Sequence, residues 1–242
     1  MSRLILAVDT TGEYGSLALV RSGEPRGGEL LDEVVLHAPN GFGQVLYGHL
    51  AELLDRHSLK PCDIDCFAAA SGPGSFTGVR VGLACVKGLA EAVGRPAVAV
   101  SNLQAVAWFG AAPLRAAVLD ARRGEVYGAV YDAAARLVTP EVVAPFARWI
   151  ETLPAGELEF ICSGYTPSLA GTRFEQAPVR TAPRALAGAV AHLASTAAPQ
   201  DPAALDANYV AALNEAESQI DRGEGMDLVT LRLQMNARFA RP

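Results

Sequence analysis

The sequence has few cysteines and histidines, and they are not arranged for a disulfide framework or a metal site. The four cysteines form no CxxC pair, and the four histidines form no HxxxH or HExxH pattern. A GxSxG nucleophile elbow is also missing. We therefore predict no metal site, no catalytic residue and no hydrolase chemistry. Reduced thiols fit a cytoplasmic protein. The cysteines are Cys62, Cys66, Cys85 and Cys162.

Long apolar runs and positive charge are scarce as well. No run approaches the ~20 residues of a membrane helix, and the short apolar run at the N-terminus soon meets Asp9. We expect neither a membrane segment nor a signal peptide. Lys and Arg number 20 against 26 Asp and Glu, so the net charge is −6. Because phosphates are contacted mainly by Lys and Arg, we expect any RNA to be held by a partner.

One pattern of strand, aspartate, small-residue turn and strand occurs twice. The first copy reaches Asp9 and returns over Tyr14–Val20, and the second reaches Asp120 and returns over Val126–Tyr131. Half of the 242 residues are apolar, which is enough to bury a substantial core. Strands followed by helices, repeated, predict an α/β protein with two related subdomains. We expect subdomains over residues 1–102 and 103–210, and an atypical helical tail over residues 211–242.

The stretch SGPGSFTGVRVGLACVKGLAEAVG, residues 71–94, predicts a sharp turn followed by a helix. One face of this helix is nearly free of side chains, because Gly78, Gly82 and Cys85 share it, so another element is expected to approach closely. The turn has two interpretations. Its backbone N–H groups cradle an anion, or it is a tight connection and nothing more. We favour the second, because no Lys follows the glycines in the P-loop manner.

Three motifs carry a resemblance to a known family. LILAVDTT, SGPGSFTGVRVGLACVKGLA and LDARRGEVYGAVY resemble the TsaB (YeaZ) family of tRNA threonylcarbamoyladenosine biosynthesis. This family is related to the TsaD ATPase and was once grouped with M22 glycopeptidases. The resemblance covers residues 1–210. It implies two tandem RNase H-like subdomains, the fold of actin, sugar kinases and Hsp70.

The resemblance also implies a function. Such a subunit is not catalytic. It pairs with TsaD and, together with the small ATPase TsaE, supports the transfer of a threonylcarbamoyl group to the adenosine beside the anticodon of tRNA. ATP and Mg²⁺ are then used by the partner complex, and this subunit needs no cofactor of its own. The alternative is a protein that acts alone as a weak ATPase or an M22-type peptidase.

The resemblance places homodimer and partner contacts on helices of the N-terminal half, here Phe42–His57 and Phe76–Val93. The apolar candidates form either the contact surface or the layer beneath it, and the sequence leaves both roles open. Many members carry a histidine where this chain has Phe42, and the tail after Val210 has no counterpart in the family. The interface candidates are Phe42, Leu46, Leu50, Phe76, Val79, Arg80, Leu83, Val86 and Lys87.

Kinase-like folds hold phosphate and Mg²⁺ with a carboxylate-bearing hairpin turn in each half. Here the second turn is a poor copy, because Arg122 and Arg123 stand where glycines would wrap a phosphate, and bulky Tyr165 follows Gly164. We favour a structural role, in which each aspartate accepts hydrogen bonds from N–H groups of its own turn. The candidates for a vestigial nucleotide site are Asp9, Thr10, Thr11, Gly12, Asp120, Gly124 and Gly164.

Overall fold

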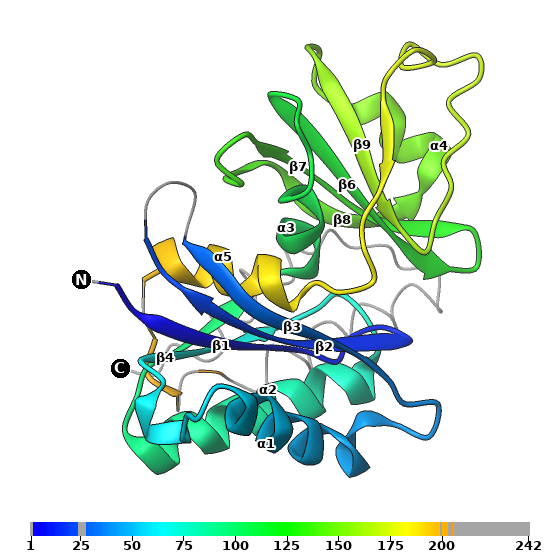
Figure 1. Cartoon of the computed structure of the whole chain (residues 1–242). Coiled ribbons are helices and arrows are strands. Elements are labelled where there is room, and N and C mark those ends of the chain that lie inside the picture. Colours follow the sequence, from blue (N-terminus) through cyan, green and yellow to red (C-terminus); the bar gives the residue numbers. More distant parts are fainter. Residues whose placement is uncertain (1, 24–27, 199, 203–204, 206–242) are drawn as a thin grey trace, which may run out of the picture. The chain divides into compact units, whose positions relative to one another are not determined.

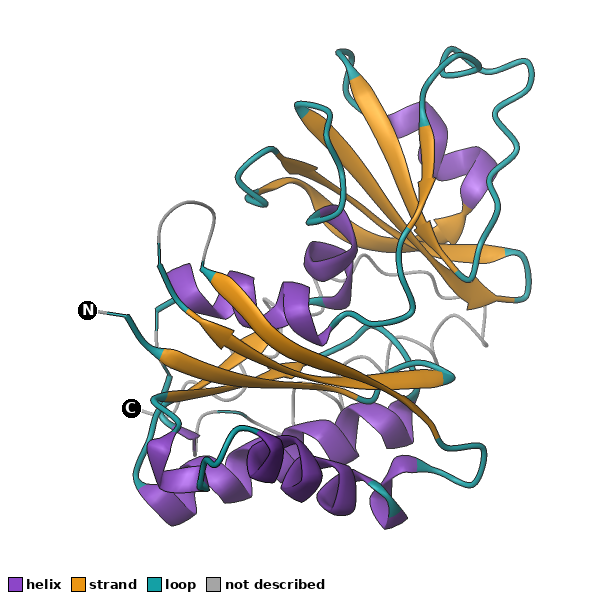
Figure 2. Cartoon of the chain, in the orientation of Figure 1, coloured by secondary structure: helices purple, strands orange, loops and turns teal. Residues whose placement is uncertain are grey.

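The computed structural model describes residues 2–23, 28–198, 200–202 and 205, and these form two compact units (Figure 1). The first unit contains the described residues of Met1–Asn102 and those from Arg184 onward, and the second contains Leu103–Pro183. Each unit is a sheet with helices against it (Figure 2). The predicted tail over residues 211–242 lies outside the described residues.

The first unit is built on a five-stranded sheet in the order β3-β2-β1-β4-β5. The first three strands are antiparallel neighbours, whereas β1, β4 and β5 run parallel. Strands β1 and β4 are buried along almost their whole length, as expected for parallel strands covered on both faces. The strands are β1 Leu4–Asp9, β2 Tyr14–Arg21, β3 Glu29–His37, β4 Cys66–Ala70 and β5 Ala97–Val100.

Helices cover both faces of this sheet (Figure 1). On one face lie α1 (Leu46–Arg56) and α2 (Phe76–Val93), whose apolar side chains form one core with alternate strand residues such as Leu17 and Phe67. On the opposite face lies α5 (Ala187–Thr196), packed on β1 and β2. The predicted helix over residues 42–57 is a short 3₁₀ helix, η1 (Phe42–Gln44), followed by α1. Another 3₁₀ helix, η2 (Pro61–Asp63), precedes β4.

The second unit repeats the same sheet. Its order is β10-β9-β6-β7-β8, with β6, β7 and β8 antiparallel and β6, β9 and β10 parallel. The predicted duplication and the RNase H-like α/β fold class are thereby confirmed. The strands are β6 Leu114–Arg122, β7 Glu125–Asp132, β8 Leu137–Pro145, β9 Leu158–Ser163 and β10 Val179–Thr181. The helices are α3 Asn102–Ala107, α4 Phe146–Trp149 and η3 Ile150–Thr152.

The division of the chain differs from the expected one after Pro183. Residues 184–210 were expected in the second subdomain, but the structure puts α5 on the first sheet. The N-cap residue of this helix, Leu186, has no side chain that can accept a hydrogen bond from the helix N–H groups. Residues of strands β2 and β3 accept these hydrogen bonds instead. Ser16 Oγ accepts hydrogen bonds from Leu186 N at 3.1 Å and Ala187 N at 2.9 Å, and Glu33 Oε1 accepts one from Gly188 N at 2.6 Å. Sequence order did not reveal partners this far apart.

Within the part of the chain that the structure describes, no helix combines the length and the apolar character required to cross a membrane. The longest of these helices, α2, has 18 residues and carries charged side chains on its outer face.

Replacing Ser16 by alanine tests the capping of α5 by the first sheet. Ser16 is fully buried, so Ser16→Ala leaves two helix N–H groups without an acceptor. We expect a loss of about 2–3 kcal/mol, seen as a melting temperature lowered by about 5–10 °C. Ser168→Ala, at an exposed serine, is the control and should melt like the parent. Equal melting of both variants would contradict this account of α5.

Candidate functional site

The first candidate turn begins where β1 ends, and its polar groups bond to one another. Asp9 is 2% exposed, Thr10 1% and Thr11 4%. Asp9 Oδ1 accepts hydrogen bonds from Thr11 N at 2.9 Å and from Thr11 Oγ1 at 2.6 Å. The aspartate therefore accepts hydrogen bonds from donors of its own turn, which is the structural role that we favour from the sequence.

Asn102 joins this turn to the Gly-Pro turn, and no sequence motif identified it. Its Nδ2 donates to Thr11 Oγ1 at 2.5 Å, and its Oδ1 accepts from Gly72 N at 2.8 Å. Its backbone N donates to Gly72 O at 2.8 Å. Asn102 is 2% exposed. The pair of polar residues after the buried strand β5, Ser101 and Asn102, is the one signal that could have marked it.

The polar groups at the start of α2 also form hydrogen bonds within the chain. Ser75 N donates to Thr11 O at 2.6 Å, and Ser75 Oγ caps the helix by accepting from Gly78 N at 3.3 Å. The Thr10 hydroxyl donates to Gly78 O at 2.6 Å. Four N–H groups of these turns, those of Thr11, Gly72, Ser75 and Gly78, thus donate to oxygens of this chain. This geometry supports the tight-connection interpretation over the anion cradle.

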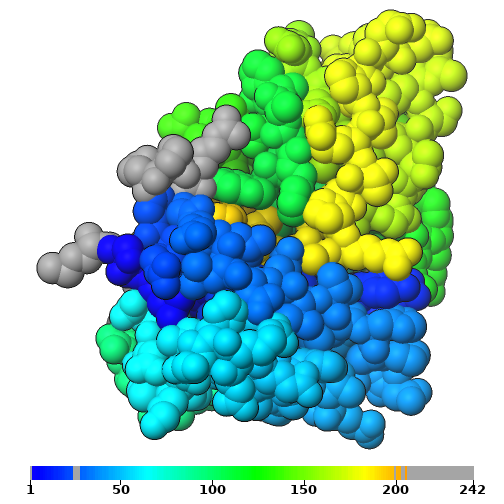
Figure 3. All heavy atoms as spheres, in the orientation of Figure 1, coloured from blue at the N-terminus to red at the C-terminus, as the bar shows by residue number. Residues whose placement is uncertain are grey.

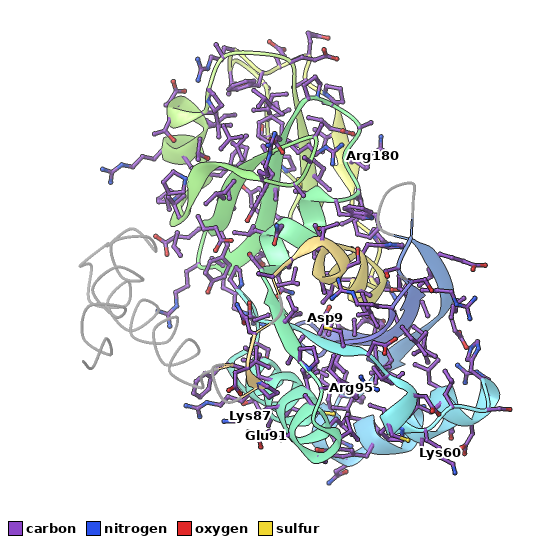
Figure 4. The ribbon with its side chains drawn as sticks, turned by 90° about the vertical axis from the view of Figure 1, so that its left-hand side faces the viewer. Asp9, Lys60, Lys87, Glu91, Arg95 and Arg180 are labelled. Atoms are coloured by element: carbon purple, nitrogen blue, oxygen red, sulfur yellow. The ribbon has the colours of Figure 1, made fainter. Side chains whose placement is uncertain are left out.

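Burial also affects the carboxylates at the Asp9 turn. Burial raises the pKa of the Asp9 carboxyl, although the hydrogen bonds from Thr11 and Asn102 offset part of the rise. Burial also raises the pKa of Glu33, and the neighbouring negative charge of Asp9 adds to it. A carboxylate that binds Mg²⁺ must be accessible, and Asp9 is 2% exposed. Figure 4 shows Asp9 within the first unit.

The small face of α2 packs against this turn. A Cβ atom on Gly82 would lie 2.7 Å from Thr10 Oγ1, and one on Gly78 would overlap the Thr10 carbonyl oxygen. The predicted close approach is therefore made by the chain's own β1–β2 hairpin. Phe42 packs similarly, because a Cβ on Gly15 would lie 2.6 Å from its ring.

The second candidate turn has a different structure. Asp120 is exposed, and its Oδ1 accepts a hydrogen bond from Arg122 N at 2.7 Å. Arg122, Arg123 and Gly124 have φ angles of 65°, 52° and 83°, in the left-handed region that favours glycine. Gly164 lies beside Asp120, with 3.9 Å between a Cβ built on it and the Asp120 Cβ. The structure thus brings Asp120, Gly124 and Gly164 together at one end of the second sheet.

Most of the apolar interface candidates lie in the core of the first unit. They are the residues of η1, α1 and α2 that face the sheet. In this chain they therefore form the buried side of these helices rather than their outer surface. Arg80 is exposed, and its guanidinium lies 3.6 Å from the centroid of the partly buried Phe76 ring. Lys87 Nζ lies 3.9 Å from Glu91 Oε1, one turn further along α2 (Figure 4). The buried candidates are Phe42, Leu46, Leu50, Val79, Leu83 and Val86.

The outward side of the two helices carries small residues and one large aromatic residue. Tyr47 is 58% exposed, and its side chain reaches the Cys85 thiol. Gly48 and Gly88 are helical glycines whose added Cβ atoms would meet nothing within 4 Å. We call this surface the α1–α2 outer face; Figure 3 shows the atoms around the end of α1 in cyan. Its exposed residues are Tyr47, Gly48, Ala51, Arg80, Ala84 and Gly88.

Among the described residues, no group of three or more His, Cys, Asp or Glu side chains is placed to hold a metal ion.

Two RNase H-like units with an aspartate at the same hairpin define an α/β protein of the actin and sugar-kinase class. A family model described as TsaD: tRNA N6-adenosine threonylcarbamoyltransferase matches residues 40–198. The tRNA threonylcarbamoyladenosine biosynthesis protein TsaB of Bacillus subtilis is 31% identical over 170 residues, which cover 68% of this chain and 72% of that protein. The chain belongs to the TsaB (YeaZ) family, as its motifs predict.

Two further relatives agree with this assignment. TsaB of Escherichia coli is 37% identical over 132 residues, which cover 52% of this chain and 54% of that protein, about half of its length. The structure of YeaZ from Pseudomonas aeruginosa has a TM-score of 0.63 and 28% identity, and covers 95% of this chain and 97% of that one. Both units thus have counterparts in a solved structure.

Two glycines of α2 provide a matched test of the packing at the Asp9 turn. Gly78→Ala places a methyl group against Thr10, so we expect a loss of at least about 2–3 kcal/mol in stability. Gly88→Ala has open space and should gain about 0.5–1 kcal/mol, because alanine is the better helix former. Urea unfolding measures both. If the two substitutions changed the free energy of unfolding by similar amounts, α2 would not pack against Thr10 of the hairpin as described.

Proposed function

We propose that this chain is a non-catalytic subunit of tRNA threonylcarbamoyladenosine biosynthesis, which binds and stabilises TsaD. In this proposal TsaD and TsaE use ATP and Mg²⁺, the complex holds the tRNA, and the reaction takes place in the cytoplasm. Family membership supports a role in this pathway, because the relatives are named as tRNA threonylcarbamoyladenosine biosynthesis proteins. The structure of the Asp9 turn supports the non-catalytic role.

The closed Asp9 turn is the observation that carries the proposal. A phosphate needs free N–H donors, and Mg²⁺ needs an accessible carboxylate. In this chain Thr11, Gly72 and Ser75 donate their N–H groups to protein oxygens. Asp9 is 2% exposed and accepts two hydrogen bonds from Thr11. The Asp9 turn therefore does not fit a magnesium-bound phosphate, and we derive no catalytic step through one.

The α1–α2 outer face is the docking surface that we propose for TsaD. A helical glycine costs about 1 kcal/mol relative to alanine, and Gly48 and Gly88 gain no contact inside this chain in return. Small residues let a second helix come close, and Tyr47 and Arg80 supply an aromatic and a cationic contact beside them. Two copies of the chain would use the same face as a homodimer, so TsaD and a second copy would compete for it.

A charge placed on this face tests the proposal. Ala84 is exposed and lies between Arg80 and Gly88, so Ala84→Glu should leave the fold intact. We expect TsaD affinity to fall at least about tenfold, which corresponds to 1.4 kcal/mol. In a reconstitution with TsaD, TsaE, ATP, the threonylcarbamoyl donor and tRNA, modified adenosine should fall with it. Ala155→Glu, at an exposed site of the second unit, is the matched control and should behave like the parent.

The alternative of a stand-alone ATPase or peptidase is tested with the same preparations. The subunit proposal expects modified tRNA only when all components are present, and little effect of Asp9→Ala on the rate per folded complex. Turnover of ATP or peptide by the chain alone, abolished by Asp9→Ala, would establish the alternative. Unchanged TsaD binding by Ala84→Glu would remove the α1–α2 outer face from the interface.

A further inference from the structure

The second unit contains a cavity of about 490 Å³, within the range of small-molecule sites. It lies beside the β6–β7 turn and the loop after β9, at the carboxyl ends of two parallel strands, where open α/β sheets commonly bind ligands. It is lined by Gly124, Pro145, Phe146, Ala147, Ile150, Glu151, Tyr165, Ser168, Ala170 and Thr172. The cavity shares no residue with the α1–α2 outer face, so a ligand bound in it is independent of the proposed function.

Two aromatic rings form one wall of this cavity. The rings of Phe146 and Tyr165 lie 5.4 Å apart between centroids. Phe146 is 7% exposed and is fixed by an edge contact with Phe160 at 6.1 Å and a tilted contact with Trp149 at 6.1 Å. A flat group that enters the cavity therefore meets a preformed aromatic surface.

The lining of the cavity carries one carboxylate. Glu151 is the one lining residue that is charged at neutral pH. Burial, then the neighbouring Cys162 thiol and Asp120 carboxylate, raise the pKa of the Tyr165 phenol, but Asp120 itself does not line the cavity. The arginines of the flanking segments, Arg122, Arg123, Arg148 and Arg173, are not among the lining residues. A phosphate or carboxylate ligand would therefore meet no positively charged side chain in the lining.

We propose that this cavity binds a planar organic cation, namely a guanidinium or amidinium group that stacks on the partly exposed Tyr165 ring, which the buried Phe146 supports, and pairs with Glu151. Guanidinium and amidinium groups are flat, delocalised and weakly hydrated, so they stack on aromatic rings and pair with carboxylates. Ser168 and Thr172 add hydroxyl oxygens to the lining; the Thr172 hydroxyl already donates to Leu169 O at 2.7 Å.

Benzamidine, benzamide and benzoate are matched probes, because they share one ring and differ in charge. Equilibrium titration by protein-observed NMR on the full chain should give benzamidine a dissociation constant of about 1 mM or tighter. Benzamide should bind at least about fivefold more weakly and benzoate weakest of all, because the cation near Glu151 is worth about 1 kcal/mol. N-acetylarginine amide, tested alongside, distinguishes an arginine side chain from a free aromatic cation as the natural source.

Two variants test whether benzamidine binds in this cavity. Glu151→Gln should reduce the preference for benzamidine over benzamide to below twofold, and Glu157→Gln, at an exposed carboxylate outside the lining, should keep it. Ala170→Trp should fill the cavity and abolish binding, whereas Ala155→Trp should not. Since Glu151→Gln changes only an exposed side chain, it tests the proposal even if Ala170→Trp does not fold.

Three results would overturn this proposal. Benzoate or benzamide that binds as tightly as benzamidine would remove the role of charge. Benzamidine binding that persists in folded Ala170→Trp would place it elsewhere. Adenosine that binds more tightly than benzamidine, with no effect of Glu151→Gln, would identify a nucleoside site instead.

Discussion

The hydrogen bonds between the Asp9 hairpin and the Gly-Pro turn are the constraint on which the first unit depends. Thr11 and Asn102 connect the two turns, and Ser75 closes the start of α2 against the hairpin. These turns carry the small and hydroxyl side chains expected at a phosphate, but here they bind each other. The packing of Gly78 and Gly82 on Thr10 then fixes α2 on the sheet and presents its other side as a rigid surface.

The same hairpin has diverged in the second unit. The two sheets share strand order and direction, so Asp9 and Asp120 occupy equivalent positions. Asp9 is buried, whereas Asp120 is exposed and is followed by arginines in a left-handed conformation. The second hairpin borders a cavity with aromatic and acidic walls instead of a helix N-terminus. One duplicated framework thus supports a closed structural turn in one half and an open pocket in the other.

The sequence predicts local structure better than distant contacts. The repeated aspartate pattern, the turn before α2 and its small face could all be predicted from spacing. Val79 and Leu83 were apolar interface candidates, but the sequence does not say whether they meet the chain's own sheet or a partner. Asn102 and Ser16 were missed because their partners lie 91 and 170 or more positions away. For the same reason α5 was expected in the second subdomain.

Amide hydrogen exchange at Thr11, Gly72, Ser75 and Gly78 tests the central claim most directly, because the hydrogen bonds of these N–H groups close the two turns. If the turns are closed on each other, all four amides exchange slowly in the free protein, and MgATP leaves their rates unchanged. Fast exchange in the free protein that becomes slow with MgATP would show an open phosphate site and contradict the account.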